Sequence, residues 1–253
     1  MITWQLRSDG RCPPGLTMKK DLELFEAVRL GSISGILRIY NWTEPALTTG
    51  FHQESFAVND PFLDIPIIRR PTGGGAVLHF DDITFSISTP QIGAFSGGIL
   101  ECSGNITHVM KSTFRGCGIE TEAKGGRHAF SPICFLRPSP AELMIGENKI
   151  MGLALAKKEG FLLMQGVIPL RVDQELSERV FGNGLKNSVK GVLDYFPDFS
   201  EDLFFQSLIE SFVSHLGILL DEGNKDDYEY HRTDERKIES RRKEVCKDHV
   251  PYQ

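Results

Sequence analysis

The 253-residue sequence has few of the features that mark extracellular, membrane or nucleic-acid-binding proteins. Its five cysteines are scattered without a CxxC pair, which favours reduced thiols over a disulfide framework or a zinc site. No apolar run approaches the roughly 18 residues that span a membrane, and residues 1–7 lack the pattern of a secretory signal. The net charge of −6 argues against a general nucleic-acid binder. We therefore expect a cytoplasmic protein without metal, membrane or nucleic-acid partners.

Hydrophobic periodicity predicts helices and short strands in one chain. Helices are expected from an N-cap at Thr17 to a stop at Gly31, over much of 98–115, and after Ser200. Alternation within 83–88 predicts a strand with one buried and one polar face. The other strand-like segments are 36–40, 46–51, 65–68, 76–78 and a meander over 141–170. Because strands pair through short turns and helices are grouped elsewhere, we predict an α+β fold.

Charge sets the end of the chain apart from the rest. Residues 221–253 include 18 charged residues in 33 and few apolar ones. Such a segment cannot bury enough apolar surface to form a core. We expect one folded domain over residues 1–220 and a charged C-terminal tail over 221–253.

A glycine run preceded by two arginines is the first candidate site. Arg69 and Arg70 add fixed positive charge and N–H donors. The glycines at 73–75 let the backbone approach a ligand closely, because no Cβ stands in the way. His79 follows the run and is either a ligand-facing residue or a strand-end surface histidine. The candidate binding residues are Arg69, Arg70, Gly73, Gly74, Gly75 and His79.

Cys134 and Lys149 form the second candidate site. Pro132 and Pro138 bracket the cysteine and would hold it on a stiff, non-helical segment. Taken alone, Cys134 is a small buried hydrophobe and Lys149 a surface lysine beside a turn. Taken together, they supply a thiol and a cation, and an adjacent cation favours the reactive thiolate and steadies the oxyanion of an attacked thioester. The pair predicts a site that holds an acyl group covalently.

These motifs resemble those of the biotin- and lipoate-protein ligase superfamily. The run Arg69–His79, with Ile83-Thr84-Phe85-Ser86 after it, is similar to the family's hallmark, which opens the substrate pocket. Residues 18–25 resemble the family's first helix, and residues 37–42 resemble its first strand. The resemblance implies an α+β catalytic domain of the ligase type, with a mixed or antiparallel sheet, flanking helices and one acyl tunnel. It adds to the candidate binding residues Thr72, Gly152 and Ala154.

The segment from Cys134 to Leu143 is similar to the motif of cysteine-dependent octanoyltransferases of lipoate assembly. In those enzymes the cysteine carries an octanoyl thioester, and a lysine fifteen positions later, here Lys149, assists it. The resemblance implies ping-pong transfer from acyl carrier protein, or from an octanoylated H-type protein, to a lysine of a lipoyl domain or a glycine-cleavage H-type protein. The donor carries the acyl group on phosphopantetheine, so no cofactor of the enzyme is expected.

Two alternatives remain open at this stage. An ATP-dependent lipoate-protein ligase would keep Lys149 and leave Cys134 incidental, and ATP is expected only in that case. A carrier-binding protein that has lost catalysis is suggested by Leu155 and Gln165, where the family has glutamine and often histidine. Phe80 is a further departure, because aspartate is usual after His79. All three departures are expected around the acyl pocket.

Overall fold

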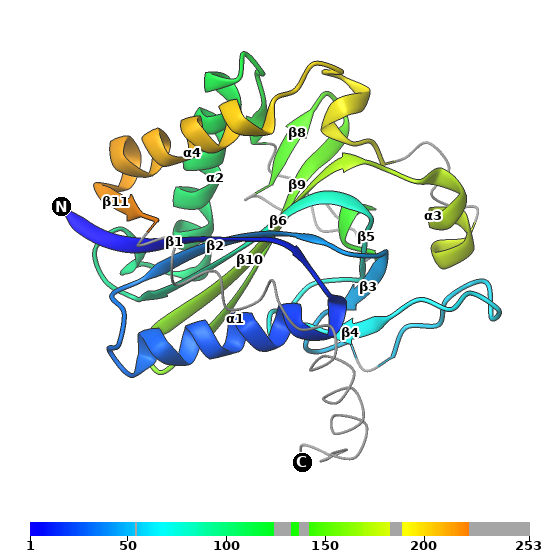
Figure 1. Cartoon of the computed structure of the whole chain (residues 1–253), viewed down its shortest axis with the longest axis horizontal. Helices are drawn as coiled ribbons and strands as arrows, with labels where there is room; N and C mark the ends of the chain where they lie inside the picture. Colours follow the sequence, from blue (N-terminus) through cyan, green and yellow to red (C-terminus); the bar gives the residue numbers. More distant parts are fainter. Residues whose placement is uncertain (54, 124–132, 137–141, 183–188, 223–253) are drawn as a thin grey trace. The chain divides into compact units, whose positions relative to one another are not determined.

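The computed structural model describes residues 1–53, 55–123, 133–136, 142–182 and 189–222. A mixed sheet runs through this part of the chain (Figure 1). Its strands are β1 (Ile2–Cys12), β2 (Ile36–Trp42), β6 (Asp81–Pro90), β7 (Glu122–Ala123), β8 (Leu143–Ile145), β9 (Asn148–Lys158), β10 (Phe161–Arg171) and β11 (Ile218–Asp221). Their order is β11-β1-β2-β6-β10-β9-β8-β7. β1 is parallel to β2 and β11, whereas the pairs from β2 to β7 are antiparallel.

A smaller sheet carries the predicted glycine run. It consists of β3 (Ala46–Thr49), β4 (Ile67–Arg69) and β5 (Val77–His79), in the order β4-β3-β5. β4 is parallel to β3, and β5 is antiparallel to it. The glycines at 73–75 lie in the connection between β4 and β5, as the strand-like flanks predicted.

Helices cover both faces of the main sheet (Figure 1). They are α1 (Pro14–Arg29), α2 (Ile99–Gly116), α3 (Gln174–Phe181) and α4 (Glu201–Leu216), with short 3-10 turns η1 (Gly93–Phe95), η2 (Cys134–Leu136) and η4 (Val192–Asp194). α2 and α4 lie on one face, where their apolar side chains join those of the sheet in the largest core cluster. α1 lies on the opposite face. The α+β class with a mixed sheet and flanking helices is confirmed.

β6 separates an apolar core from a polar interior. Ile83, Phe85 and Ile87 are at most 1% exposed and belong to the core cluster on the α2 and α4 side. Thr84 and Ser86 are 3% and 2% exposed, although they belong to the opposite, polar face. The predicted polar face is therefore buried as well, because α1 and the small sheet cover it.

Most predicted elements form, with one clear error at the first helix. α1 begins at Pro14, and the predicted N-cap Thr17 lies inside the helix, where its hydroxyl donates to the carbonyl of Pro14 at 2.8 Å. Proline fits the first helical position because its φ is preset and its missing N–H has no partner there. α4 does begin after Ser200, whose hydroxyl accepts from the backbone N–H of Leu203. The strands β1 and β11 and the helix α3 were not predicted.

A compact unit spans Met1–Asp221. The prediction of a charged tail concerns residues that, from 223 on, lie outside the described part of the chain, so the domain division stays a prediction. In the described part, no helix is both long and apolar enough to cross a membrane.

Candidate active site

The turn η2 holds Cys134 against the end of the glycine loop. The backbone N–H of Cys134 donates to the carbonyl of Ala76 at 2.9 Å, and Ile133 forms a parallel bridge with the same residue. Ala76 directly follows the glycine run. Two motifs that lie about sixty residues apart in the sequence are thus joined by main-chain contacts.

Lys149 lies near the start of β9 and is only 4% exposed. Its Nζ lies 3.3 Å from Cys134 Sγ and 3.0 Å from the carbonyl oxygen of Cys134. It also donates to the carboxylate of Glu142, which is itself 4% exposed. Lys149 is therefore a buried cation beside the thiol and not the surface lysine of the alternative interpretation. The ammonium is thus in direct contact with the sulfur.

A pocket of about 380 Å³, open to solvent, lies beside the thiol. Its lining comes from β9, β10, β6 and β2 of the main sheet, from α1, and from β3 and β5 of the small sheet, so it lies between the two sheets. Among the residues predicted from the sequence, it brings together Cys134, Arg70, His79, Gly152 and Ala154. The residues on its walls are mainly apolar or glycine, which suits an acyl chain.

Gly152 leaves room next to the reactive atoms. A Cβ at this position would lie 3.6 Å from Cys134 Sγ and 3.4 Å from Lys149 Cε. Because glycine has no Cβ, this space beside the thiol stays open.

Arg70 supports the glycine loop from inside the protein. It is 5% exposed, and its Nη2 donates to the carbonyls of Gly73 and Gly75 at 2.6 and 2.9 Å. Burial lowers the pKa of Arg70, and the neighbouring Cys134 opposes that effect. Gly74 has a φ of +96°, and a Cβ there would lie 2.7 Å from Arg70 Nη2. Glycine is therefore required at this position both by its backbone conformation and by the close approach of the guanidinium.

Arg69 and the glycines are placed differently from Arg70. Arg69 is exposed, and its Nη2 donates to the carbonyl of Gln53 at 3.4 Å. Neither Arg69 nor the glycines at 73–75 line the pocket. Thr72 is fully buried and donates to Gln165 Oε1 at 2.7 Å, so it meets the pocket through a lining residue. The substrate-binding roles of these residues remain predictions.

His79 is buried in the wall of the pocket. It is 4% exposed, and its ring stacks on Trp42 with 4.2 Å between the centroids. Its Nδ1 contacts Asp82 at 2.9 Å, and its Nε2 contacts the hydroxyl of Thr48 at 3.0 Å. Both ring nitrogens are thus engaged, and the interpretation of His79 as a surface histidine is wrong.

Residues 13–213 match the lipoyl protein ligase A/B catalytic domain family. The chain belongs to this family. It is 32% identical to octanoyltransferase LipM of Exiguobacterium sibiricum, over 68% of this chain and 67% of that protein. It is 35% identical to octanoyltransferase LipM of Carboxydothermus hydrogenoformans, over 71% of this chain and 70% of that protein. These relatives are acyltransferases by name, which favours the transferase prediction over the ligase alternative.

Solved structures of the family share the fold. A lipoate-protein ligase A bound with ATP has a TM-score of 0.70 and 23% identity, with 98% of this chain and 95% of that chain covered. A lipoate protein ligase from Thermoplasma acidophilum, solved in a study of that enzyme and its E2 lipoyl domain, has a TM-score of 0.64 and 22% identity, with 98% and 93% covered. At these identities the likeness concerns the fold alone.

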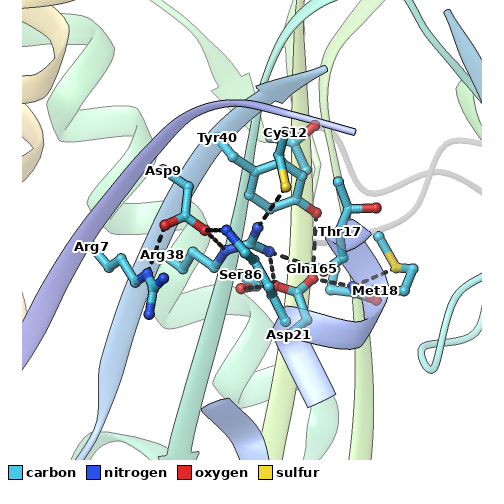
Figure 2. Close-up of polar contacts among 12 residues, drawn as sticks. Arg7, Asp9, Cys12, Thr17, Met18, Asp21, Arg38, Tyr40, Ser86 and Gln165 are labelled. Carbon is cyan, nitrogen blue, oxygen red and sulfur yellow. Dashed lines mark hydrogen bonds and ion pairs between the residues drawn. The ribbon is translucent and has the colours of Figure 1, made fainter. Parts of the chain in front are cut away.

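A buried polar network that the sequence analysis missed lies beside the pocket (Figure 2). Gln165 lines the pocket, and its Nε2 donates to Asp21 of α1 at 2.6 Å. Asp21 also accepts from Arg38 and Ser86, each at 2.6 Å. Arg38 and Asp21 are 0% exposed. The signal was an arginine within the otherwise apolar strand Ile36–Tyr40, because a charge in such a run is tolerated only when it is paired.

The three departures from the family pattern occupy different surroundings. Gln165 lies in the pocket wall, with its amide held by Asp21 and Thr72. Leu155 packs against the core cluster and does not line the pocket. Phe80 is 42% exposed and is also absent from the pocket wall. The expectation that all three surround the acyl pocket is therefore wrong for Leu155 and Phe80.

Glu142 is a further residue of the site that the sequence analysis did not single out. It lies seven residues before its partner Lys149, at the entry to the hairpin of β8 and β9. Within the described residues, no group of three or more histidine, cysteine or acidic side chains is arranged to hold a metal ion.

Proposed function

We propose that this protein is an octanoyltransferase of lipoate assembly that works through a Cys134 thioester. The observation that carries the proposal is the buried Lys149 ammonium 3.3 Å from Cys134 Sγ, at the wall of a largely apolar pocket. A thiolate is a strong nucleophile toward thioesters, and a fixed cation beside it lowers the cost of forming both the thiolate and the oxyanion.

In the first half-reaction, Cys134 Sγ attacks the carbonyl carbon of an octanoyl group on a carrier protein's phosphopantetheine. The bond from that carbon to the phosphopantetheine sulfur breaks, and the free carrier thiol departs. The pocket receives the acyl chain, and Gly152 leaves space for the carbonyl next to Sγ. The Lys149 ammonium stabilises the negative charge that develops on the carbonyl oxygen.

In the second half-reaction, the ε-amine of a target lysine attacks the same carbonyl carbon. An amide forms, the bond to Cys134 Sγ breaks, and the cysteine regains its thiol. We propose a lipoyl domain or a glycine-cleavage H-type protein as the acceptor. The similarity to a ligase that was studied together with its lipoyl domain supports this class of acceptor. The donor is proposed as acyl carrier protein or an octanoylated H-type protein.

Because the donor is already a thioester, the proposed reaction needs neither ATP nor a bound cofactor. The test compares transfer to a lipoyl domain from octanoyl-carrier protein alone with transfer from octanoate plus ATP. We expect transfer in the first mixture only. Efficient transfer from octanoate and ATP that survives Cys134→Ser would support the ligase alternative. Carrier binding without transfer in either mixture would support the catalytically lapsed alternative.

A further inference from the structure

All three N–H donors of the Lys149 ammonium have an acceptor. They point to the carbonyl oxygen of Cys134 at 3.0 Å, to Cys134 Sγ at 3.3 Å and to Oε1 of Glu142. A lysine ammonium has three donors and no acceptor. In this state Lys149 cannot take the proton of the Cys134 thiol, because its nitrogen has no free electron pair.

The Glu142 carboxylate can take a proton from Lys149 and so free its nitrogen to accept the thiol proton. The Lys149 and Glu142 side chains are 2% and 5% exposed, so water exchanges protons with them poorly. A proton that leaves the thiol for Lys149 must be matched by one that leaves Lys149 for Glu142. The row Sγ, Nζ, Oε1 provides that path through two contacts that the structure shows.

We propose that Glu142 stores the thiol proton during acyl transfer, an inference that rests on the proposed function. In the first half-reaction an N–H bond of Lys149 breaks and an O–H bond forms on Glu142, which leaves a free electron pair on Nζ. The Sγ–H bond then breaks, and a new N–H bond forms on Lys149. The result is a thiolate beside an intact ammonium and a neutral carboxylic acid. After Sγ attacks, the stored proton returns through Lys149 to the departing phosphopantetheine sulfur.

The second half-reaction uses the same path. The attacking amine of the acceptor lysine must lose one proton as the amide forms. Lys149 first gives a proton to Glu142 and then takes the proton of the amine. The proton on Glu142 returns through Lys149 to the Cys134 sulfur as its bond to the acyl carbon breaks. Protons balance, and Glu142 ends as a carboxylate. Because Glu142 acts through Lys149 and touches no substrate atom, it is a positioning residue.

The test is the rate of octanoyl-Cys134 formation, measured by quenched-flow intact mass from about pH 6 to about pH 8. Wild type should show a nearly level rate, because the proton stays within the site. Glu142→Gln should be about 100-fold slower at the acid end, in the range of general acid–base effects. Its deficit should shrink by about tenfold per pH unit, because the site must then lose a proton to solvent. Glu142→Asp, which keeps the carboxylate, should restore part of the rate and the level profile.

Arg70, His79 and Tyr40 are the other charged or titratable groups on the described pocket wall, and these variants leave them unchanged. Glu147→Gln, at an exposed turn of the same hairpin, is the matched control and should behave as wild type. An equal loss at every pH in Glu142→Gln, or none at all, would overturn the relay. So would a wild-type rate that rises tenfold per pH unit, a measurement that does not depend on the variant folding. Absence of any adduct on wild-type Cys134 would instead refute the proposed function.

Discussion

At the scale of single residues, the burial of Lys149 beside Cys134 decides which chemistry the site supports. A surface lysine would exchange its contacts with water, whereas this one is fixed by the backbone and side chain of Cys134 and by Glu142. The ring of Phe135 lies 5.1 Å from Nζ and adds a cation–π contact. The positive charge is thus held next to the sulfur before any substrate arrives.

The Lys149→Ala variant should react with iodoacetamide more slowly than wild type near neutral pH, because the thiolate loses its nearest cation. At high pH, where the thiol is ionised in both proteins, the two rates should converge. Octanoyl transfer should fall further, because the same ammonium stabilises the oxyanion, a role worth about 3 kcal/mol for one donor. Lys149→Arg should recover little, since a planar guanidinium does not replace a compact ammonium. Superimposable pH profiles of labelling in all three proteins would contradict this role.

The sequence predicts Cys134 and Lys149 because each belongs to a recognisable local motif. Glu142 gives no such signal, since its importance arises only when the hairpin of β8 and β9 folds it onto Lys149. Arg38 does carry a signal, a charge within an apolar strand, but its partner Asp21 does not, because their pairing joins β2 to α1. Side chains whose partners come from distant segments are visible only in the folded structure.

At the scale of elements, the loop between β4 and β5 depends on the Arg70 side chain. The guanidinium spans the carbonyls of Gly73 and Gly75, a bridge that needs two directed donors on one planar group. A lysine at position 70 would keep the positive charge but could not place two donors on one planar group.

Arg70→Lys should therefore weaken the loop without unfolding the protein. We expect a loss of about 1–2 kcal/mol in the free energy of unfolding, the cost of one or two buried hydrogen bonds. The KM for octanoyl-carrier protein should rise more than kcat falls, because Arg70 itself lines the pocket and supplies no reacting atom. Steady-state kinetics and urea titration measure the two effects. A variant with wild-type KM and stability would show that the loop keeps its shape without the arginine.

Asp9 of β1 forms ion pairs with Lys20 of α1 and with Arg38 of β2. Burial by itself would raise the pKa of Asp9, but hydrogen bonds and charge from Arg7 and Arg38 lower it to about 2. The Asp9 side chain is 4% exposed, and its oxygens lie 2.6 Å from Arg7 Nε and 2.7 Å from Arg38 Nε. The carboxylate thus holds three elements together in its charged form.

Because the folded pKa lies below the unfolded value, Asp9 stabilises the protein fully above about pH 4 and loses this contribution as the pH falls toward 2. The shift corresponds to about 2 kcal/mol. Asp9→Asn should therefore be less stable than wild type by about that amount at pH 6, and the difference should disappear near pH 2. Urea unfolding followed by circular dichroism across this range provides the measurement. If the difference in free energy of unfolding between the two proteins stayed constant with pH, the lost stability would come from packing and not from the charge of Asp9.

The local sequence pattern predicts α2, α4 and the meander of β8 to β10, because their helical apolar spacing or their turn residues are clear. It failed at β1 and β11, which are short or partly exposed strands held by parallel pairing with each other. Parallel pairing joins segments that lie far apart in the chain, so the sequence contains no short turn that would indicate the pair.

At the scale of the whole folded unit, the main sheet divides structural and chemical roles between its two faces. The face toward α2 and α4 is an apolar core. The opposite face carries the buried polar network and the pocket beside Cys134, under α1 and the small sheet. A single sheet thereby supplies an apolar core on one side and the candidate site on the other.

The central claim is that Cys134 carries the acyl group, and intact-mass analysis of the purified protein tests it most directly. After incubation with octanoyl-carrier protein in the absence of ATP, wild type should gain the mass of one octanoyl group. Hydroxylamine should remove it, because thioesters are labile to that reagent. Peptide mapping should place the group on Cys134, and Cys134→Ser should remain unmodified and transfer nothing to a lipoyl domain. An unmodified wild-type protein that still transfers octanoyl groups, or a serine variant with wild-type transfer, would contradict the account.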